Sequence, residues 1–292
     1  MPTLTGAPSS IPDLEASAVL DQAGSENFPV ASVLLPRRVR SHLLAVYGFA
    51  RLADDIGDEV DGDRLAQLDW LESELERAAA GSATHPILVQ LMPTLAQLDV
   101  SLDPFRALIE ANRVDQRVTR YQTMDELVAY CQLSAVPVGR LVLSVFGVST
   151  PERVALSDEV CIGLQLTEHL QDVGEDARRG RIYLPTRDRE AFGVTEDELL
   201  APNASPSLRR LVAVHVNRAH QRLAPGRPLA RQLPWQPRIA VAGFVGGGEA
   251  ALDAIRRAGY DVLGTRCRPR RLGVGARLAE TLFASSSDRA AA

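Results

Sequence analysis

The stretch LLAVYGFARLADDIGDE, residues 43–59, joins an apolar helical pattern to a dense cluster of carboxylates. Leu43, Val46, Ala50 and Asp54 recur at steps of three and four residues, which is the spacing of one face of an α-helix. On that helix Asp54 and Asp58 stand one turn apart, where two like charges destabilise an isolated helix by about 0.2–0.5 kcal/mol. A helix that keeps such a pair needs something that compensates for the repulsion.

A second stretch, TEHLQDVGEDARRG at residues 167–180, repeats this arrangement. Asp172 and Asp176 are again four residues apart, and Glu168 lies one turn before them. The apolar segment VCIGLQL, residues 160–166, precedes these carboxylates, as LLAVYGFARL precedes the first cluster. The sequence therefore predicts two helices that are largely apolar and that each carry a group of carboxylates.

Each acidic cluster has an ordinary interpretation, because charges at helical spacing usually form the solvated face of an amphipathic helix. The apolar surroundings of both clusters favour interior helices instead, and buried carboxylates without a partner are costly. Magnesium takes oxygen ligands and usually binds through one or two carboxylates together with substrate phosphate and water. The two clusters together favour a metal-lined site for a diphosphate.

Helical periodicity dominates the whole chain, and alternating strand-like segments are scarce. A chain of 292 residues with 46% hydrophobic residues can bury one large core. We therefore expect a single all-α domain over residues 18–283, with roughly eight to eleven helices and flexible segments at residues 1–17 and 284–292.

Charge and terminal composition restrict the partners and the compartment. The net charge is −5 and the arginines are dispersed, so the chain lacks the basic stripe of a nucleic-acid-binding protein. The first residues lack the features of a signal peptide, and we find no run that approaches about 20 apolar residues. Arg37, Arg38 and Arg40 could meet diphosphate or anionic lipid headgroups, although a solvated face is their commoner role. We expect a cytoplasmic protein that is at most peripheral to the inner face of the cell membrane.

Longer segments around both clusters resemble the signature regions of squalene and phytoene synthases. These are ENFPVASVLLPRRVRSHLLAVYGFARLADDIGDE at residues 26–59 and GLQLTEHLQDVGEDARRGRIYLP at residues 163–185. The segment DELVAYCQLSAVPVGRLVLSVFG, residues 125–147, resembles the intervening helix of that family. With RAGYDVL at residues 257–263, the resemblance covers roughly residues 20–270.

The resemblance implies a helical bundle around a central apolar cavity that holds an isoprenoid diphosphate. It implies magnesium ligands at Asp54, Asp58, Asp172 and Asp176, with Glu168 as a further candidate. Residues near the diphosphate would be Tyr47, Arg51, Ser25 and Arg181. Residues that line the cavity would be Gln165, Tyr183, Asn27, Phe28 and Val138, and also Phe49 and Leu141, although any apolar member of this set could equally be ordinary core.

Three departures from the family pattern bear on the choice of reaction. Glu168 stands where most members have asparagine, and its extra charge leaves open whether two or three magnesium ions bind. Asn27 and Phe28, within ENFPVAS, resemble the hydroxysqualene synthase branch of hopanoid biosynthesis. Gly248 replaces an aromatic residue of many relatives, which is expected to open space at that end of the cavity.

The expected reaction is ionisation of presqualene diphosphate, rearrangement and capture by water to give hydroxysqualene. No phosphate-binding loop of a dinucleotide fold is found, so NADPH is not expected. Condensation of two farnesyl diphosphates or of two geranylgeranyl diphosphates remains an alternative, and a catalytically inactive assembly factor of the same fold is a further one. Other squalene-pathway enzymes are expected partners, and the oligomeric state stays open. His169 is interpreted as a surface or core histidine, because it points about 100° away from Glu168 on the helix.

Overall fold

The computed structural model describes residues 35–98, 100–264, 267–269 and 271–283 of the chain. Helices make up its regular structure: thirteen α-helices and one 3-10 helix, with a single isolated bridge between Arg120 and Ile182 and no strand in the described ranges. The all-α prediction is confirmed. The helices outnumber the eight to eleven expected, because several short ones follow breaks that sequence periodicity does not reveal. The terminal segments 1–17 and 284–292 lie outside the described residues.

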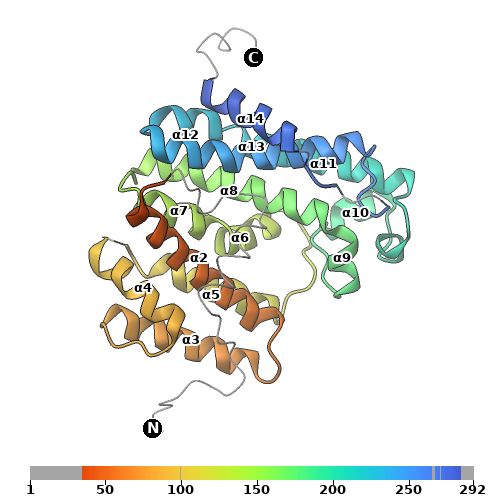
Figure 1. Cartoon of the computed structure of the whole chain (residues 1–292). Helices are drawn as coiled ribbons and strands as arrows, with labels where there is room; N and C mark the ends of the chain where they lie inside the picture. Colours follow the sequence, from red (N-terminus) through yellow and green to blue (C-terminus); the bar gives the residue numbers. More distant parts are fainter. Residues whose placement is uncertain (1–34, 99, 265–266, 270, 284–292) are drawn as a thin grey trace. The chain divides into compact units, whose positions relative to one another are not determined.

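The chain forms two compact units, the first comprising the described part of Met1–Val118 together with Pro137–Ser149. Its helices are α2 (Arg37–Asp58), α3 (Arg64–Ala79), α4 (Pro86–Gln97), α5 (Asp103–Asp115) and α7 (Val136–Val145). The second unit comprises Thr119–Val136 and the described part of Thr150–Ala292. Its helices are α6 (Met124–Ser134), α8 (Pro151–Gln171), α9 (Val173–Arg178), α10 (Thr186–Phe192), the 3-10 helix η1 (Asp197–Leu200), α11 (Pro206–Leu223), α12 (Gly226–Gln232), α13 (Trp235–Arg257) and α14 (Arg271–Phe283) (Figure 1).

The core of the first unit is built around α2, which packs against α3, α4 and α5. Phe49 of α2 is 0% exposed and meets Phe105 of α5 edge to face, with ring centroids 5.0 Å apart. Burying one such side chain stabilises the fold by about 1.5–3 kcal/mol. Leu141 of α7 belongs to the same core. The apolar run of residues 43–53 thus fixes α2 in place, and with it the carboxylates near its C-terminal end.

The second unit is built around α8 and α13. Helix α8 packs against α11, α12 and α13, and α14 lies along α13 (Figure 1). Gly246 of α13 permits that approach, because a Cβ atom there would lie 2.8 Å from the backbone nitrogen of Leu278. The space expected at Gly248 is absent within this unit, so that prediction is wrong. A Cβ atom at Gly248 would lie 2.6 Å from Leu164 and 3.1 Å from Leu223, whose side chains fill the place of the missing aromatic ring.

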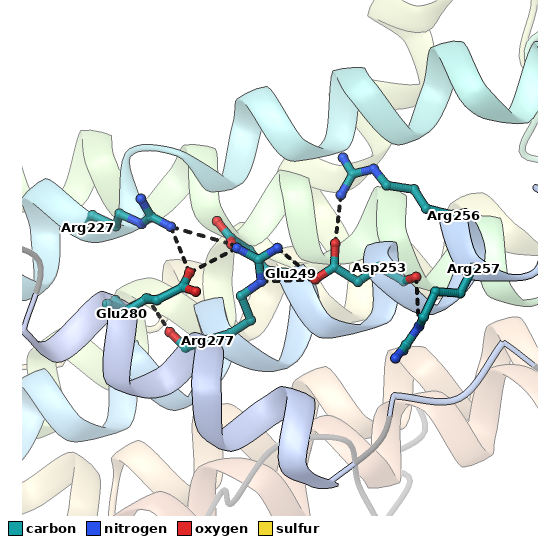
Figure 2. Close-up of polar contacts among 8 residues, drawn as sticks. Arg227, Glu249, Asp253, Arg256, Arg257, Arg277 and Glu280 are labelled. Atoms are coloured by element: carbon teal, nitrogen blue, oxygen red, sulfur yellow. Dashed lines mark hydrogen bonds and ion pairs between the residues drawn. The ribbon is translucent and has the colours of Figure 1, made fainter. Parts of the chain in front are cut away.

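An ion network ties α12, α13 and α14 together (Figure 2). The carboxylate of Glu249 is 4% exposed and lies 3.3 Å from an Nη atom of Arg277 and 3.7 Å from an Nη atom of Arg227. Glu280, which is 50% exposed, meets the same two arginines at 2.9 Å and 3.3 Å. Asp253 adds a contact of 2.7 Å to Arg277. One buried and one exposed carboxylate therefore share the same cations.

Because Glu249 and Glu280 contact the same two arginines, replacing each in turn compares a buried with an exposed ion pair. Glu249→Ala is expected to destabilise the protein by about 2 kcal/mol, because it removes the buried partner of two half-buried arginines. Glu280→Ala is expected to cost less than about 1 kcal/mol, because an exposed ion pair is screened by water. Thermal unfolding should show Tm lower by about 4–8 °C for Glu249→Ala and nearly unchanged for Glu280→Ala. Equal shifts in the two variants would show that burial does not set the strength of this network.

One helical stretch, Met124–Val145, is long and apolar enough to cross a membrane by length and composition. Asp125, Glu126 and Arg140 interrupt its apolar residues, so it does not stand out in the sequence as an apolar run. Its helix is not continuous: α6 ends at Ser134, and Pro137 follows within the first turn of α7. Buried helices of soluble proteins share this composition, so the stretch is weak evidence for membrane insertion.

Candidate functional site

The first acidic group lies on the last turns of α2 and divides into two pairs with different partners. Arg51 binds Asp55 at 2.7 Å and Glu59 at 3.2 Å, and Asp55 is buried. The negative charge of one of the two like-charged pairs is thus partly compensated by an arginine of the same helix. The other pair, Asp54 and Asp58, keeps contact with solvent.

A residue of α5 makes a hydrogen bond to the side chain of Asp54. The Nδ2 atom of Asn112 donates a hydrogen bond to Oδ1 of Asp54 over 3.1 Å. Asp54 still reaches solvent, but the protein atoms packed around it partly desolvate its carboxyl group and raise its pKa to about 7. The hydrogen bond from Asn112 opposes the rise, and repulsion from Asp58 adds to it. A carboxylate whose charge is so disfavoured gains from a nearby cation.

Two other predicted residues of the first unit lie beside its core. Tyr47 and Val138 are half-buried and pack against the buried cluster around α2. Phe49 and Leu141, the other residues of this unit that were expected to line the cavity, are fully buried within that cluster. Within the first unit, Phe49 and Leu141 are therefore ordinary core residues. Ser25, Asn27 and Phe28 lie outside the described residues.

The second acidic group lies where α8 gives way to α9. The sequence predicts Glu168, Asp172 and Asp176 on one helix, but α8 ends at Gln171 and Asp172 leaves the helical conformation, with φ −106° and ψ 11°. The amide of Asp172 still donates to the carbonyl of Glu168 (3.0 Å), and that of Asp176 donates to the carbonyl of Asp172 (2.8 Å). The joint keeps the spacing of one turn between successive carboxylates while changing the direction of the chain.

The carboxylates at this joint are also disfavoured as anions. Desolvation raises the pKa of Asp172, and repulsion from Glu175 adds to the rise. Desolvation raises the pKa of Asp176 to about 7, and repulsion from Asp172 is the next cause. Both acidic groups of the chain thus contain a carboxyl group that is only partly ionised near neutral pH, and both would be stabilised by a bound cation.

Aromatic side chains lie beside the second acidic group. Tyr183 stacks on the imidazole of His169 with ring centroids 3.7 Å apart, and it also stacks on Tyr121 and Tyr130 at 5.8 Å. Burial lowers the pKa of His169 to about 3, so this imidazole is neutral. A small pocket adjoins the cluster and is lined by His169, Val173, Asp176, Ile182, Tyr183, Leu184 and Leu199. Asp176 and Tyr183, two predicted site residues, therefore share one pocket.

Arg181 and Gln165 are placed by their neighbours in the second unit. Gly180 turns the chain with φ +81°, a conformation that favours glycine, and the amide of Arg181 then donates to the carbonyl of Asp176 over 2.9 Å. A short parallel bridge at Ile182 fixes the segment that follows. Gln165, on α8, has its Nε2 atom 3.4 Å from Nε2 of His169. Desolvation raises the pKa of Asp176 and the positive charge of Arg181 opposes that rise, so both side chains belong to the surroundings of the second acidic group.

The donor atoms of both groups suit magnesium. In the described part of the chain, no three or more metal-ligating side chains converge on one point. Magnesium does not require that, because one or two carboxylates with phosphate and water complete its six ligands. The oxygen donors and the raised pKa values of Asp54 and Asp176 are consistent with such a partial site in each unit.

Sequence reasoning missed two residues with specific contacts to predicted ones. Asn112 lies 58 positions from Asp54, and its signal is a polar residue among the buried apolar residues of α5. His169 is a neutral histidine packed among other side chains, as expected, but the sequence does not reveal that it stacks on Tyr183. Its neighbourhood follows from the turn at Gly180, which brings Tyr183 back beside α8.

Comparisons of the sequence and of the structure with known proteins all find squalene and phytoene synthases. The model of the squalene/phytoene synthase family matches residues 22–273. The chain is 41% identical over 212 residues to a hydroxysqualene synthase of Rhodopseudomonas palustris, covering 71% of each chain. It is 32% identical over 264 residues to a phytoene synthase of Arthrospira platensis, covering 83% of each. The crystal structure of squalene synthase HpnC from Alicyclobacillus acidocaldarius superposes with a TM-score of 0.76 at 45% identity, over 84% of this chain and 94% of that one.

Proposed function

Because the chain belongs to the squalene/phytoene synthase family, we propose that it converts presqualene diphosphate to hydroxysqualene. The chain is an enzyme of this family, and its fold is the all-α isoprenoid synthase fold. The observation that carries the proposal is the 41% identity to a hydroxysqualene synthase over 212 residues. The two groups of carboxylates support it, because each contains one carboxyl group whose pKa is raised to about 7.

We propose that Asp54, Asp58, Asp172 and Asp176, with Glu168, hold two or three magnesium ions and the diphosphate. When bound, magnesium neutralises the diphosphate and makes it a better leaving group. Arg51 is suited to assist, because Asp55 and Glu59 fix its guanidinium while its buried Nε atom has no acceptor within the described residues. Arg181 and Tyr47 would add a further charge and a hydroxyl group near the leaving oxygen atoms.

The reaction balances without a reductant. The bond between the substrate carbon and the bridging oxygen breaks, and diphosphate leaves with the electron pair. The resulting cyclopropylcarbinyl cation rearranges, and a water molecule adds to it and loses a proton, so that presqualene diphosphate and water give hydroxysqualene and diphosphate. NADPH has no role in this scheme.

The other residues of the proposed site would bind the hydrocarbon. Gln165, Val138, Ser25, Asn27 and Phe28 would line the cavity together with Tyr183. A water-poor cavity keeps the cation from reacting at random positions along its chain. We place the enzyme in the cytoplasm, in peripheral contact with the membrane and with other squalene-pathway enzymes, because its substrate and its product are both long-chain lipids.

A second candidate is condensation of two prenyl diphosphates, favoured by the 32% identity to a phytoene synthase over 264 residues. Product analysis separates the candidates. The purified protein is incubated with magnesium and, separately, with presqualene, farnesyl or geranylgeranyl diphosphate, without NADPH. Hydroxysqualene from presqualene diphosphate alone is the expected product. Presqualene diphosphate from the farnesyl substrate, or phytoene from the geranylgeranyl substrate, would assign the chain to a condensing branch.

A further inference from the structure

We propose that Asn112 is a positioning residue for Asp54. Glycine at position 57 leaves the space that the side-chain amide of Asn112 occupies. The inference rests on the proposed function, in which Asp54 binds magnesium. It adds a residue from α5 that itself would touch neither the metal nor the substrate. All the contacts that carry it lie within the first unit.

The amide nitrogen of Asn112 donates two hydrogen bonds. Its Nδ2 atom donates to Oδ1 of Asp54 over 3.1 Å and to the carbonyl of Leu108, one turn earlier on α5, over 3.2 Å. The residue is 6% exposed, whereas Asp54 keeps contact with solvent. A buried donor whose direction is fixed by its own helix thus holds an accessible carboxylate.

Gly57 lies directly against this amide. A Cβ atom at Gly57 would lie 2.1 Å from Oδ1 of Asn112 and 2.9 Å from its Cγ atom. Any other residue at position 57 would therefore displace the amide from its present position. Gln116 reinforces the contact, since its Nε2 atom donates to the carbonyl of Gly57 over 3.0 Å and to that of Asn112 over 3.1 Å.

The chemical consequence concerns how Asp54 presents its oxygen atoms. A carboxylate at the accessible end of a helix can rotate about two bonds, and each unproductive rotamer lowers its affinity for a cation. The hydrogen bond from Asn112 occupies one lone pair of Oδ1 and restricts that rotation, while Oδ2 takes no part in this bond and would serve as a ligand. Groups that orient metal ligands in this way typically change metal affinity by about 10- to 100-fold when they are removed.

The direct test measures metal affinity without turnover. Mn²⁺, which replaces magnesium and has an electron paramagnetic resonance signal, is titrated into the full-length protein in the presence of inorganic pyrophosphate. Asn112→Ala is expected to weaken Mn²⁺ binding about 10-fold. Thr94→Val is the matched control, because Thr94 is also buried in the first unit and its hydroxyl bonds only to His42, at 2.9 Å, among the contacts described. Its Mn²⁺ affinity should equal that of the wild type.

Asp54→Ala separates failure of this inference from failure of the proposed function. If Asp54→Ala loses Mn²⁺ affinity while Asn112→Ala retains it, Asn112 is a structural residue only and the inference is wrong. If Asp54→Ala also retains wild-type affinity, the metal role of Asp54 is wrong and the inference falls with it. In turnover assays, Asn112→Ala should raise the magnesium concentration for half-maximal rate about 10-fold, with a smaller change in the rate at saturating magnesium.

Gly57→Ala tests the geometry from the other side of the contact. The single variant should weaken Mn²⁺ binding about as much as Asn112→Ala, because its new methyl group displaces the amide. In the double variant Gly57→Ala/Asn112→Ala the methyl group has no amide to displace, so affinity should equal that of Asn112→Ala alone. Additive losses in the double variant would show that Gly57 acts on Asp54 by another route, and would overturn the paired role.

Discussion

Replacing Asp172 with alanine is expected to lower the turnover of presqualene diphosphate about 1,000-fold. Loss of one metal-holding carboxylate removes several kcal/mol of stabilisation from the departing diphosphate, and each 1.36 kcal/mol is a tenfold change in rate. Asp172 lies at the joint between α8 and α9, and its side chain makes no capping hydrogen bond to α9. Removing that side chain should therefore leave both helices intact. The loss should therefore appear in the rate constant at saturating substrate. The thermal stability should be nearly unchanged or raised, because the surrounding protein disfavours the ionised form of Asp172.

Glu175 provides the matched control for Asp172. It is exposed, lies three residues further on, and pairs with Arg179 at 3.0 Å on the surface of α9. Glu175→Ala removes the same charge from the same helical turn, and it should retain at least about half of the wild-type rate, since an exposed pair contributes little. Equal losses in the two variants would attribute the effect to the net charge of α9, and would contradict a specific role for Asp172.

Removing divalent cations is expected to reduce turnover still further, to less than about 0.1% of the full rate, because both acidic groups would lose their cations at once. The wild-type enzyme is treated with a chelator, dialysed and assayed with and without added magnesium. Magnesium should restore the full rate. The carboxyl groups with a pKa of about 7, Asp54 and Asp176, should then release protons on binding the cation, which calorimetry in buffers of different ionisation enthalpy detects.

A chelated enzyme that keeps a tenth or more of its rate would contradict the role proposed for the carboxylates. Calcium is a useful comparison, because it prefers more ligands at longer distances than magnesium. It should bind to the same carboxylates yet support little turnover. Restoration of the full rate by calcium would show that charge alone, and not the octahedral geometry of magnesium, is what the site requires.

The sequence was sufficient to predict the helix that carries the first acidic group. The three- and four-residue steps from Leu43 to Asp54 correspond to α2, whose apolar face is buried against α3, α4 and α5. Helical periodicity is a property of consecutive residues, so it can be recognised without tertiary information. The family resemblance over residues 26–59 and 163–185 is confirmed, whereas the candidate ligands that it implies stay a prediction.

Contacts between distant residues could not be predicted in the same way. Glycine at position 248 indicated empty space, but Leu164 of α8 and Leu223 of α11 occupy it, and no pattern within residues 242–255 reveals those neighbours. The pairing of Arg51 with Asp55 and Glu59, in preference to Asp54, depends on side-chain rotamers that helical spacing leaves open. The break at Asp172 was also missed, because the backbone hydrogen bonds on either side keep the expected spacing.

The measurement that tests the central claim most directly is the origin of the oxygen atom in the product. The enzyme is incubated with presqualene diphosphate and magnesium in water enriched in oxygen-18, without NADPH, and the alcohol is analysed by mass spectrometry. Ionisation followed by capture of water predicts hydroxysqualene that carries one oxygen-18 atom. An unlabelled presqualene alcohol would mean that the bond between oxygen and phosphorus is cleaved instead, with no carbocation formed, and would contradict the account.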